Sequence, residues 1–305
     1  MAPNKPLRLP LAVAEVDRAA HLRSDESYLT SSWPTAQVLI FTDEKFATKD
    51  DQLFYESGAS LGQYQDQNDY FLGTKDSKAY FVRDLQSGEI AGLDFKTLRQ
   101  IGASLSPTDI GLAVHAQALA NWHKKHPRCS QCGSTTKVVL AGAVRRCEAD
   151  QSEHYPRTDG AIIVLVKDNQ NRILLGRQKV WPKNRFSTFA GFVEPGESFE
   201  NCLRREVMEE AGVDISEINY LGSQPWPFPA SLMIAFEALT STPEKARPDG
   251  EEIEEIRWFT RAQMKSAIED KSLILPLEIS VARQMIKAWY GEGADTELVG
   301  NESWR

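Results

Sequence analysis

Three glutamates, Glu206, Glu209 and Glu210, stand at a spacing that places them on one face of a helix. At about 100° per residue, positions i, i+3 and i+4 fall within one narrow arc of the helix surface. Crowded carboxylates repel one another, so such a cluster needs a cation or basic partners beside it. An all-oxygen ligand set without histidine suits Mg²⁺ or Mn²⁺. The spacing therefore predicts a divalent-metal site, although an acidic, solvated helix face would show the same pattern.

Residues that favour helix ends flank these glutamates. Ser198 suits the N-cap position, and Gly212 suits the left-handed residue that ends a helix. Leu203, Val207 and Ala211 form an adjacent apolar stripe. We therefore expect a helix with one buried edge and one acidic edge.

The glutamates lie within a longer pattern, G-x5-E-x7-R-E-U-x-E-E-x-G-U with U aliphatic. The matching residues are Gly191, Glu197, Arg205, Glu206, Val207, Glu209, Glu210, Gly212 and Val213. The stretch resembles the box of the Nudix hydrolases, which split a nucleoside diphosphate linked to another group. The resemblance implies that the three helix glutamates hold the catalytic metals and that one of them activates the attacking water. It also implies that Glu197 and Arg205 brace the loop. The helical period places Arg205 on a different side of the helix from Glu206 and Glu210, where it could pair with Glu197.

A second motif, SQPWPFPAS, occupies residues 223–231. Prolines at alternate positions force an extended backbone that cannot lie inside a sheet, and they present Trp226 and Phe228 on a rigid frame. From composition, the segment is either the rim of a binding site or a cap over a core edge. The motif resembles the diagnostic sequence of the NADH pyrophosphatase branch of the Nudix family. The residues that this resemblance makes candidates for substrate binding are Ser223, Gln224, Trp226, Phe228 and Ser231.

Two further aromatic residues match positions that flank the nicotinamide in that family. Tyr155 precedes the expected Nudix domain, and Phe192 follows the first glycine of the box. Stacking a flat ring between aromatics contributes roughly 1–3 kcal/mol per ring. Either residue could instead be ordinary packing.

Three cysteines upstream of the box have the spacing of a zinc ribbon. Cys129 and Cys132 form a Cys-x2-Cys knuckle, and Cys147 follows. Zinc prefers four nitrogen or sulfur ligands, and the fourth is open: His154 is the better ligand chemically, whereas the family spacing falls on Asp150. A chain without bound zinc is the third alternative. We expect His154 to complete a structural Zn²⁺ site.

The acidic run EEIEEIRW at residues 251–258 offers a further metal ligand. The family places such a glutamate six residues before a tryptophan, which here is Trp258, and that spacing selects Glu252. Glu255 is the rival, and a solvated charged edge is the plain alternative.

Length and composition indicate an ordinary globular protein. A length of 305 residues is enough for two globular domains. The composition, 41% hydrophobic and 26% charged, is that of an ordinary soluble protein. No apolar run approaches the roughly 20 residues that span a bilayer, and the first residues lack a signal-peptide core. Clustered cysteines favour a reducing compartment. We therefore expect a cytosolic protein without a membrane partner, and the net charge of −8 disfavours broad capture of nucleic acid.

Hydrophobic periodicity predicts an α+β chain. Strands are expected at 36–46 and 78–92, two helices within 94–125 with a break at Ser106-Pro107, two strands at 160–178 joined by a turn at 168–171, and a closing helix near 277–290. The expected domains are an N-terminal α+β domain at 1–125, a zinc ribbon at 126–155, a Nudix α/β/α sandwich with a mixed sheet at 156–290, and a flexible tail at 291–305.

The resemblance implies hydrolysis of the pyrophosphate of NAD(H) to nicotinamide mononucleotide and AMP, with NAD-capped RNA as a larger substrate bearing the same end. A homodimer is implied in the same way. Two alternatives remain: a broader Nudix hydrolase of ADP-ribose or dinucleoside polyphosphates, and a catalytically silent module that binds nucleotide or RNA. The proline motif argues against the first, and the complete set of box glutamates argues against the second.

Overall fold

The computed structural model describes residues 6–85, 88 and 90–299. The chain forms two compact units that interleave along the sequence. Among the described residues, the C-terminal unit contains residues 6–10, Asp159–Gln224 and residues 232–299. The N-terminal unit contains Leu11–Thr158 and Pro225–Ser231. The proline motif is therefore divided: its first two residues belong to one unit and the rest to the other.

The N-terminal unit is built on a seven-stranded mixed sheet with the path β3-β2-β1-β6-β5, on which β4 pairs with β1 and β7 with β2. β1 pairs with β6 in parallel, whereas its pairing with β2 is antiparallel. The strands are β1 Gln37–Thr42, β2 Lys45–Lys49, β3 Gln52–Leu53, β4 Tyr55–Ser57, β5 Asp69–Lys75, β6 Lys78–Asp84 and β7 Asp94–Thr97. The strands expected at 36–46 and 78–92 are confirmed in β1, β2 and β6, but β6 ends at Asp84, before the expected end at 92. Residues 86, 87 and 89 lie outside the described residues.

Three α-helices accompany this sheet: α1 Glu26–Ser32, α2 Leu98–Ile101 and α3 Pro107–Lys125. The predicted break before Pro107 is confirmed, because the Ser106 hydroxyl caps α3 by accepting from the Asp109 backbone N–H at 3.1 Å. Residues 94–97 differ from the prediction. They form β7, paired with β2, rather than the start of a helix.

A small antiparallel sheet follows α3, with the order β10-β9-β8. Its strands are β8 Thr136–Val139, β9 Val144–Cys147 and β10 Glu153–His154. Cys129 and Cys132 precede this sheet, and Cys147 is the last residue of β9, as the ribbon prediction requires. None of the helices in the described residues is long and apolar enough to cross a membrane.

The C-terminal unit has a six-stranded sheet with the path β14-β15-β11-β12-β16, and β13 pairs with β11. The strands are β11 Asp159–Lys167, β12 Ile173–Gln178, β13 Phe189–Phe192, β14 Ser216–Trp226, β15 Ser231–Leu239 and β16 Ile253–Phe259. The predicted turn between β11 and β12 is confirmed. The Asp168 carboxylate accepts from the backbone N–H groups of Gln170 and Arg172, each at 2.9 Å.

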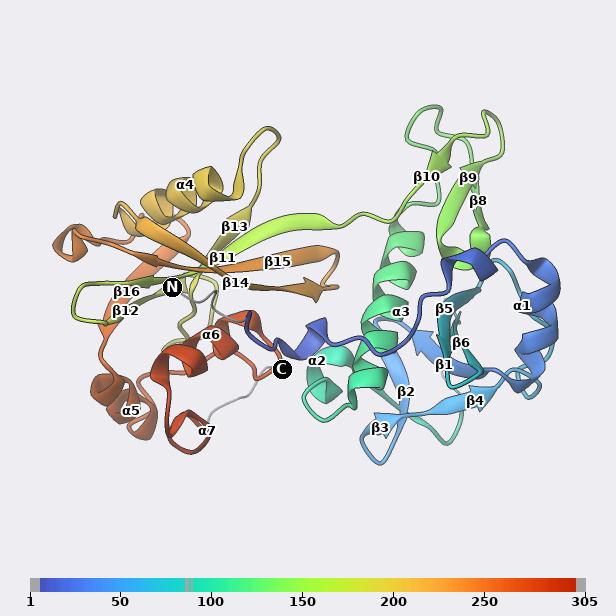
Figure 1. Ribbon diagram of the computed structural model, residues 1–305, viewed down its shortest axis with the longest axis horizontal. Helices are drawn as coiled ribbons and strands as arrows, with labels where there is room; N and C mark the ends of the chain where they lie inside the picture. The colour runs from blue at the N-terminus through green and yellow to red at the C-terminus, as the bar shows by residue number, and fades with distance from the viewer. Residues whose placement is uncertain (1–5, 86–87, 89, 300–305) are drawn as a thin grey trace. The chain divides into compact units, whose positions relative to one another are not determined.

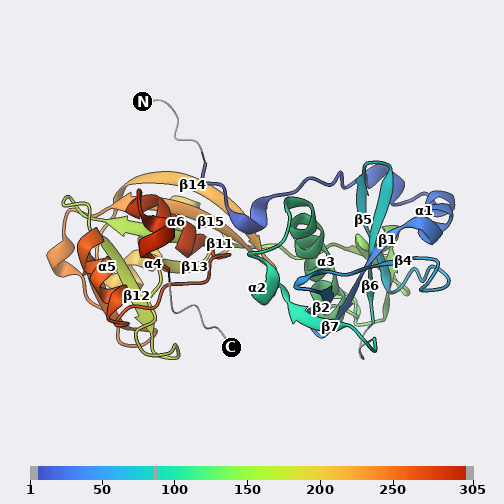
Figure 2. The ribbon, with the colours of Figure 1, turned by 90° about the horizontal axis from the view of Figure 1, so that it is seen from below.

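Alternation along β11 divides the core of this unit into two layers. Ile162 and Val164 face a cluster that contains the buried apolar residues of α4 Phe199–Ala211. Ile163 and Leu165 face the opposite cluster, which contains buried apolar residues of α5 Arg261–Glu269 and α6 Val281–Tyr290. Figure 1 shows α4 and α6 on opposite faces of the sheet, and Figure 2 views it from the side of α5 and α6. The predicted α/β/α sandwich, and the α+β fold class with a ribbon between two domains, are confirmed.

Both ends of the chain depart from the sequence-based expectation. Leu9, placed by sequence in the N-terminal domain, is 2% exposed and packs in the core of the C-terminal unit. Residues 291–299 are no loose tail: α7 spans Ala294–Glu297, and Leu298 is fully buried. The rest of the expected tail, residues 300–305, lies outside the described residues.

Candidate active site and zinc site

Helix α4 begins and ends where its sequence predicts. The Ser198 hydroxyl accepts from the Asn201 backbone N–H at 3.3 Å, and Gly212 ends the helix at φ 68°. Leu203, Val207 and Ala211 are fully buried. The packing of this apolar edge fixes the rotation of α4 about its axis, and this rotation determines where Glu206, Glu209 and Glu210 lie.

Glu206 lies against the strand that precedes the box loop. A Cβ built on Gly191, in β13, would come within 1.9 Å of the Glu206 carboxyl carbon. Only glycine leaves room for that carboxylate. The Glu206 side chain is 13% exposed, and its burial raises its pKa.

Glu210 is the most deeply buried of the three helix glutamates, at 5% exposure. Burial, and then the negative charges of Glu252 and Glu206, raise the pKa of its carboxyl to about 8. Its Oε2 atom is buried and has no hydrogen-bond partner among the described residues. A buried oxygen of this kind favours a bound cation or a proton.

Arg205 braces the loop and also contacts the acidic edge. Its guanidinium donates to both carboxylate oxygens of Glu197, at 2.7 and 2.8 Å, and this partner lowers the pKa of Glu197 to about 2. The predicted pair is thus present. The expected separation from Glu206 is wrong, because Arg205 Nη1 donates to Glu206 at 2.8 Å and to Glu209 at 3.1 Å.

Glu252 lies directly before β16. Its carboxylate accepts from Gln178 Nε2 at 2.6 Å, and its charge raises the pKa of both Glu206 and Glu210. The rival Glu255 is instead paired with Arg257 at 2.7 Å. The geometry therefore favours Glu252 as the additional carboxylate of the site.

Sequence reasoning missed one further carboxylate. Asp249 also raises the pKa of Glu210, so its charge lies close to the site. Its oxygens accept from the backbone N–H groups of Glu251, Glu252 and Ile253. The Asp249-Gly250 pair before the acidic run could have indicated this turn from the sequence. The turn fixes the backbone at Glu252, whose N–H donates to Asp249.

The three clustered cysteines meet a carboxylate. Within the described part of the chain, one group of three or more metal-ligating side chains has all its ligand atoms within 4.8 Å of one another: Cys129, Cys132, Cys147 and Asp150. Backbone N–H groups of Ala149 and Asp150 point at the Cys147 sulfur, at 3.4 and 3.5 Å. This is a second knuckle in which Asp150 takes the position of a fourth cysteine.

His154, our expected fourth ligand, is absent from that group. Its ring nitrogens lie 3.2 Å from the Ser152 hydroxyl and 3.5 Å from the Ser130 hydroxyl. The structure thus favours the alternative, Asp150. The physical reason is reach: in β10, His154 has already left the turn that carries the knuckle.

The two predicted nicotinamide neighbours are exposed. Phe192, in β13 of the C-terminal unit, is 59% exposed, and Tyr155, in the N-terminal unit, is 64% exposed. The Tyr155 hydroxyl donates to Glu153 at 2.9 Å. Large exposed aromatics leave a surface free for a ligand or a partner.

The proline segment is mostly engaged with protein. Gln224 is fully buried and donates to the Ile279 carbonyl at 2.9 Å, which points to a structural role rather than substrate contact. Trp226 and Phe228 are half-buried and meet edge to face, with ring centroids 4.9 Å apart. Ser223 and Ser231, at the ends of the segment, are half-buried.

Comparison with known proteins decides the family. Three family models match in order: an NADH pyrophosphatase-like rudimentary NUDIX domain at residues 27–122, an NADH pyrophosphatase zinc ribbon domain at 124–155 and a NUDIX domain at 156–277. A protein of Mycobacterium bovis named NAD-capped RNA hydrolase NudC is 36% identical over 288 residues, which cover 90% of this chain and 92% of that protein. The chain belongs to the NADH pyrophosphatase branch of the Nudix hydrolases.

Two other relatives have names of the same kind. The NudC of Mycobacterium tuberculosis is 35% identical over 288 residues, covering 90% of this chain and 92% of its own. The human NAD-capped RNA hydrolase NUDT12 is 36% identical over 197 residues, covering 61% of this chain and 42% of its own. The matched family implies a divalent metal and a ribbon zinc. The side chains present fit both, since an orphaned buried oxygen faces the first site and three thiols converge on the second.

Proposed function

We propose that this Nudix hydrolase cleaves the pyrophosphate of NAD(H), releasing nicotinamide mononucleotide and AMP. The observation that carries the proposal is the carboxylate pair of half-buried Glu206 and buried Glu210, with Glu206 against the Gly191 backbone and the charge of Glu252 acting on both, in a chain that also carries the SQPWPFPAS motif. A pyrophosphate resists water because its charged oxygens repel nucleophiles. Catalysis therefore needs positive charge held at a fixed place.

Glu206, Glu209, Glu210 and Glu252 would hold Mg²⁺ or Mn²⁺, since all their ligand atoms are oxygens. When bound, the metal neutralises phosphate charge and lowers the pKa of water. The chain's own residues supply the alignment. Arg205 holds Glu197 with two hydrogen bonds and so fixes the loop that leads into α4. We propose that one of the helix glutamates accepts the proton of the attacking water.

The same site suits RNA whose 5′ end carries NAD, because the scissile bond and the nicotinamide end are shared. The names of the mycobacterial and human relatives support this second substrate. The exposed rings of Phe192 and Tyr155 are our candidates for contact with the flat nicotinamide.

For the ribbon we propose one structural Zn²⁺ per chain, held by Cys129, Cys132, Cys147 and Asp150. We further propose a cytosolic homodimer. Free thiols persist in a reducing compartment, and the exposed aromatics of each unit are available to a second copy. Sedimentation of the purified protein tests the dimer.

The test of the function is a side-by-side measurement of kcat/KM on NADH, NAD⁺, NAD-capped RNA and ADP-ribose, with Mg²⁺ or Mn²⁺ supplied in turn. We expect cleavage of the NAD-bearing substrates to exceed that of ADP-ribose, and no cleavage without a divalent metal. Equal efficiency on ADP-ribose and NADH would instead indicate the broader Nudix hydrolase.

A further inference from the structure

The carbonyl of Pro227 is held by two buried amides of helix α3. Gln117 Nε2 donates to it at 2.9 Å and Asn121 Nδ2 at 3.0 Å. Asn121 Nδ2 also lies 3.4 Å from the Pro229 carbonyl. Gln117 and Asn121 are 1% and 6% exposed and stand one helical turn apart. All of these residues belong to the N-terminal unit.

These hydrogen bonds satisfy backbone carbonyls of the proline segment that would otherwise lack donors. β14 ends at Trp226, so the sequence-based expectation that the whole proline motif lies outside a sheet holds only for residues 227–230. Pro227 and Pro229 have no N–H, so this turn has few donors of its own to hold it in place. Buried carbonyls nevertheless require donors. The α3 amides supply them, and the Phe228 N–H closes a local turn onto the Trp226 carbonyl at 2.7 Å.

Packing alone does not explain a glutamine at the buried position 117. Its Oε1 atom is buried without a hydrogen-bond partner among the described residues. An unpaired buried oxygen is destabilising, and a leucine of similar size would avoid it. Reversing the amide does not help, because it would set Oε1 against the Pro227 oxygen. The donated hydrogen bond is therefore what the glutamine provides.

A third side chain of the same unit holds the rings of the segment. The Arg99 guanidinium lies 4.1 Å from the centre of the Phe228 ring and 5.2 Å from that of Trp226. Burial lowers the pKa of Arg99. The backbone and the rings of residues 226–228 are thus both fixed by the N-terminal unit.

We propose that Gln117 and Asn121 are positioning residues for substrate choice, which they govern by fixing the backbone at Pro227. The segment continues directly into β14 and β15, strands of the sheet that carries the catalytic helix. The rudimentary domain then sets the path of the motif that distinguishes NADH pyrophosphatases from other Nudix enzymes. The inference rests on the proposed function and adds the residues that enforce its specificity.

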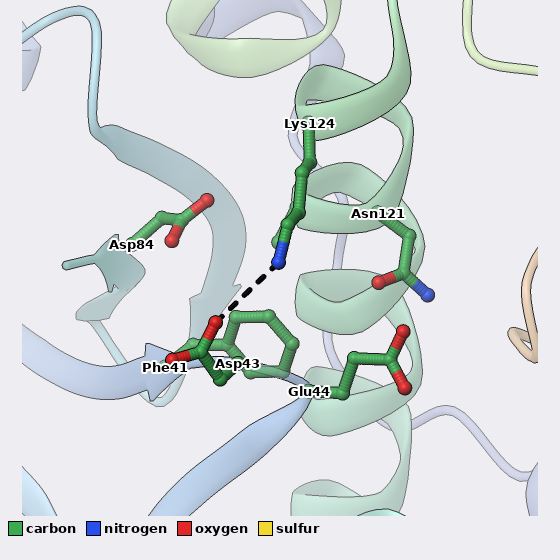
Figure 3. Close-up of a pocket in the computed structure, with 7 residues that line it drawn as sticks. Phe41, Asp43, Glu44, Asp84, Asn121 and Lys124 are labelled. Atoms are coloured by element: carbon green, nitrogen blue, oxygen red, sulfur yellow. Dashed lines mark hydrogen bonds and ion pairs between the residues drawn. The ribbon is translucent and has the colours of Figure 1, made fainter. Parts of the chain in front are cut away.

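The test substitutes Gln117→Leu and Asn121→Leu in the full-length protein and measures kcat/KM on NADH and on ADP-ribose. We expect the NADH value to fall at least tenfold more than the ADP-ribose value, mainly through KM. Zinc content and thermal melting confirm that each variant is folded. Lys124→Gln is the matched control: Lys124 is on the same helix but pairs with the exposed Asp43 at 3.4 Å (Figure 3), so both efficiencies should be unchanged.

A further variant separates positioning from packing. Asn121→Asp keeps the shape, but its carboxyl can donate to Pro227 only when protonated. The preference of this variant for NADH should therefore decrease as the pH rises, while that of the wild type stays level. A flat profile in Asn121→Asp would contradict the donated bond.

The outcomes are distinct. Equal losses on both substrates in the leucine variants would show that the amides merely stabilise the fold and would overturn the inference. An unchanged preference in folded leucine variants would overturn it as well. If the wild type itself does not prefer NADH, the proposed function fails first and the inference falls with it.

Discussion

The Glu206 carboxylate occupies the space that a side chain at Gly191 would fill, with the carboxyl carbon 1.9 Å from an ideal Cβ. The position of the Glu206 carboxylate therefore depends on the absence of a side chain at Gly191. The glycine is required by contact with the Glu206 side chain rather than by backbone conformation.

Gly191→Ala should therefore displace Glu206. We expect only a small change in stability, because the clashing atoms are the end of a flexible side chain that can move aside, and a loss of activity on the order of 10²-fold from the misplaced carboxylate. Thermal melts and steady-state rates on NADH measure the two effects. Gly160→Ala is the control, because a Cβ there would meet Val193 at an ordinary 3.8 Å. Full activity in Gly191→Ala would contradict the steric argument.

Glu210→Gln should abolish turnover and leave the fold intact. It should also change how stability depends on pH in protein freed of Mg²⁺ and Mn²⁺ by dialysis. Because burial raises the pKa of Glu210 to about 8, the folded state binds a proton that the unfolded state releases above its ordinary pKa near 4.5. This group's stabilisation is complete below pH 4.5 and is lost as the pH rises through 8.

Melting temperatures of both proteins between pH 5 and 8.5 test that sign. The wild type should lose more stability with rising pH than Glu210→Gln does, and added Mg²⁺ should offset the loss only in the wild type. Parallel pH profiles would refute the buried, charge-crowded position of Glu210.

Asp150→Ala should bring bound zinc well below one atom per chain, because it removes one of four ligands that lie within 4.8 Å of one another. His154→Ala should retain full zinc, and Asp150→Cys should retain it too. Elemental analysis of protein purified without chelators gives the stoichiometry. Zinc loss in His154→Ala alone would show that His154 is the fourth ligand.

Phe192→Ala should reduce the preference for NADH over ADP-ribose. Only NADH has a nicotinamide to lose a stacking partner, so the ratio of kcat/KM values should fall by roughly 5- to 150-fold, the equivalent of about 1–3 kcal/mol. Phe199→Ala removes another exposed ring of the same unit, one that contacts Phe236, and should leave the ratio unchanged. An equal defect on both substrates in Phe192→Ala would show that this ring does not read nicotinamide.

Features governed by neighbouring residues were predictable from the sequence. Ser198 and Gly212 mark the ends of α4, and Ser106-Pro107 marks the start of α3, because caps act within one helical turn. The turn at Asp168 is local in the same way. The pairing of Arg205 with Glu197 was predictable because the family motif fixes both residues.

Features governed by long-range contacts were not. Nothing near Gln224 in the sequence indicates that it turns inward to Ile279, and the partners of Pro227 lie on a helix more than a hundred residues earlier. The choice of Asp150 over His154 depended on backbone N–H groups that point at the Cys147 sulfur. Zinc prefers histidine to aspartate chemically, but the path of the backbone determines which of the two side chains reaches the cysteines.

The position of the first described residues bears on how the chain matures on the ribosome. The Leu7 backbone N–H donates to the Leu221 carbonyl at 2.7 Å, and Leu9 is buried among residues of the same unit. These leucines are synthesised early, yet the strand that receives them is translated only after the rudimentary domain and the ribbon. The core of the C-terminal unit therefore joins residues from both sides of the N-terminal unit in the sequence, and it can form only after the intervening residues have been translated. A fragment that starts at residue 156 would lack both leucines and would expose the apolar surface that they cover.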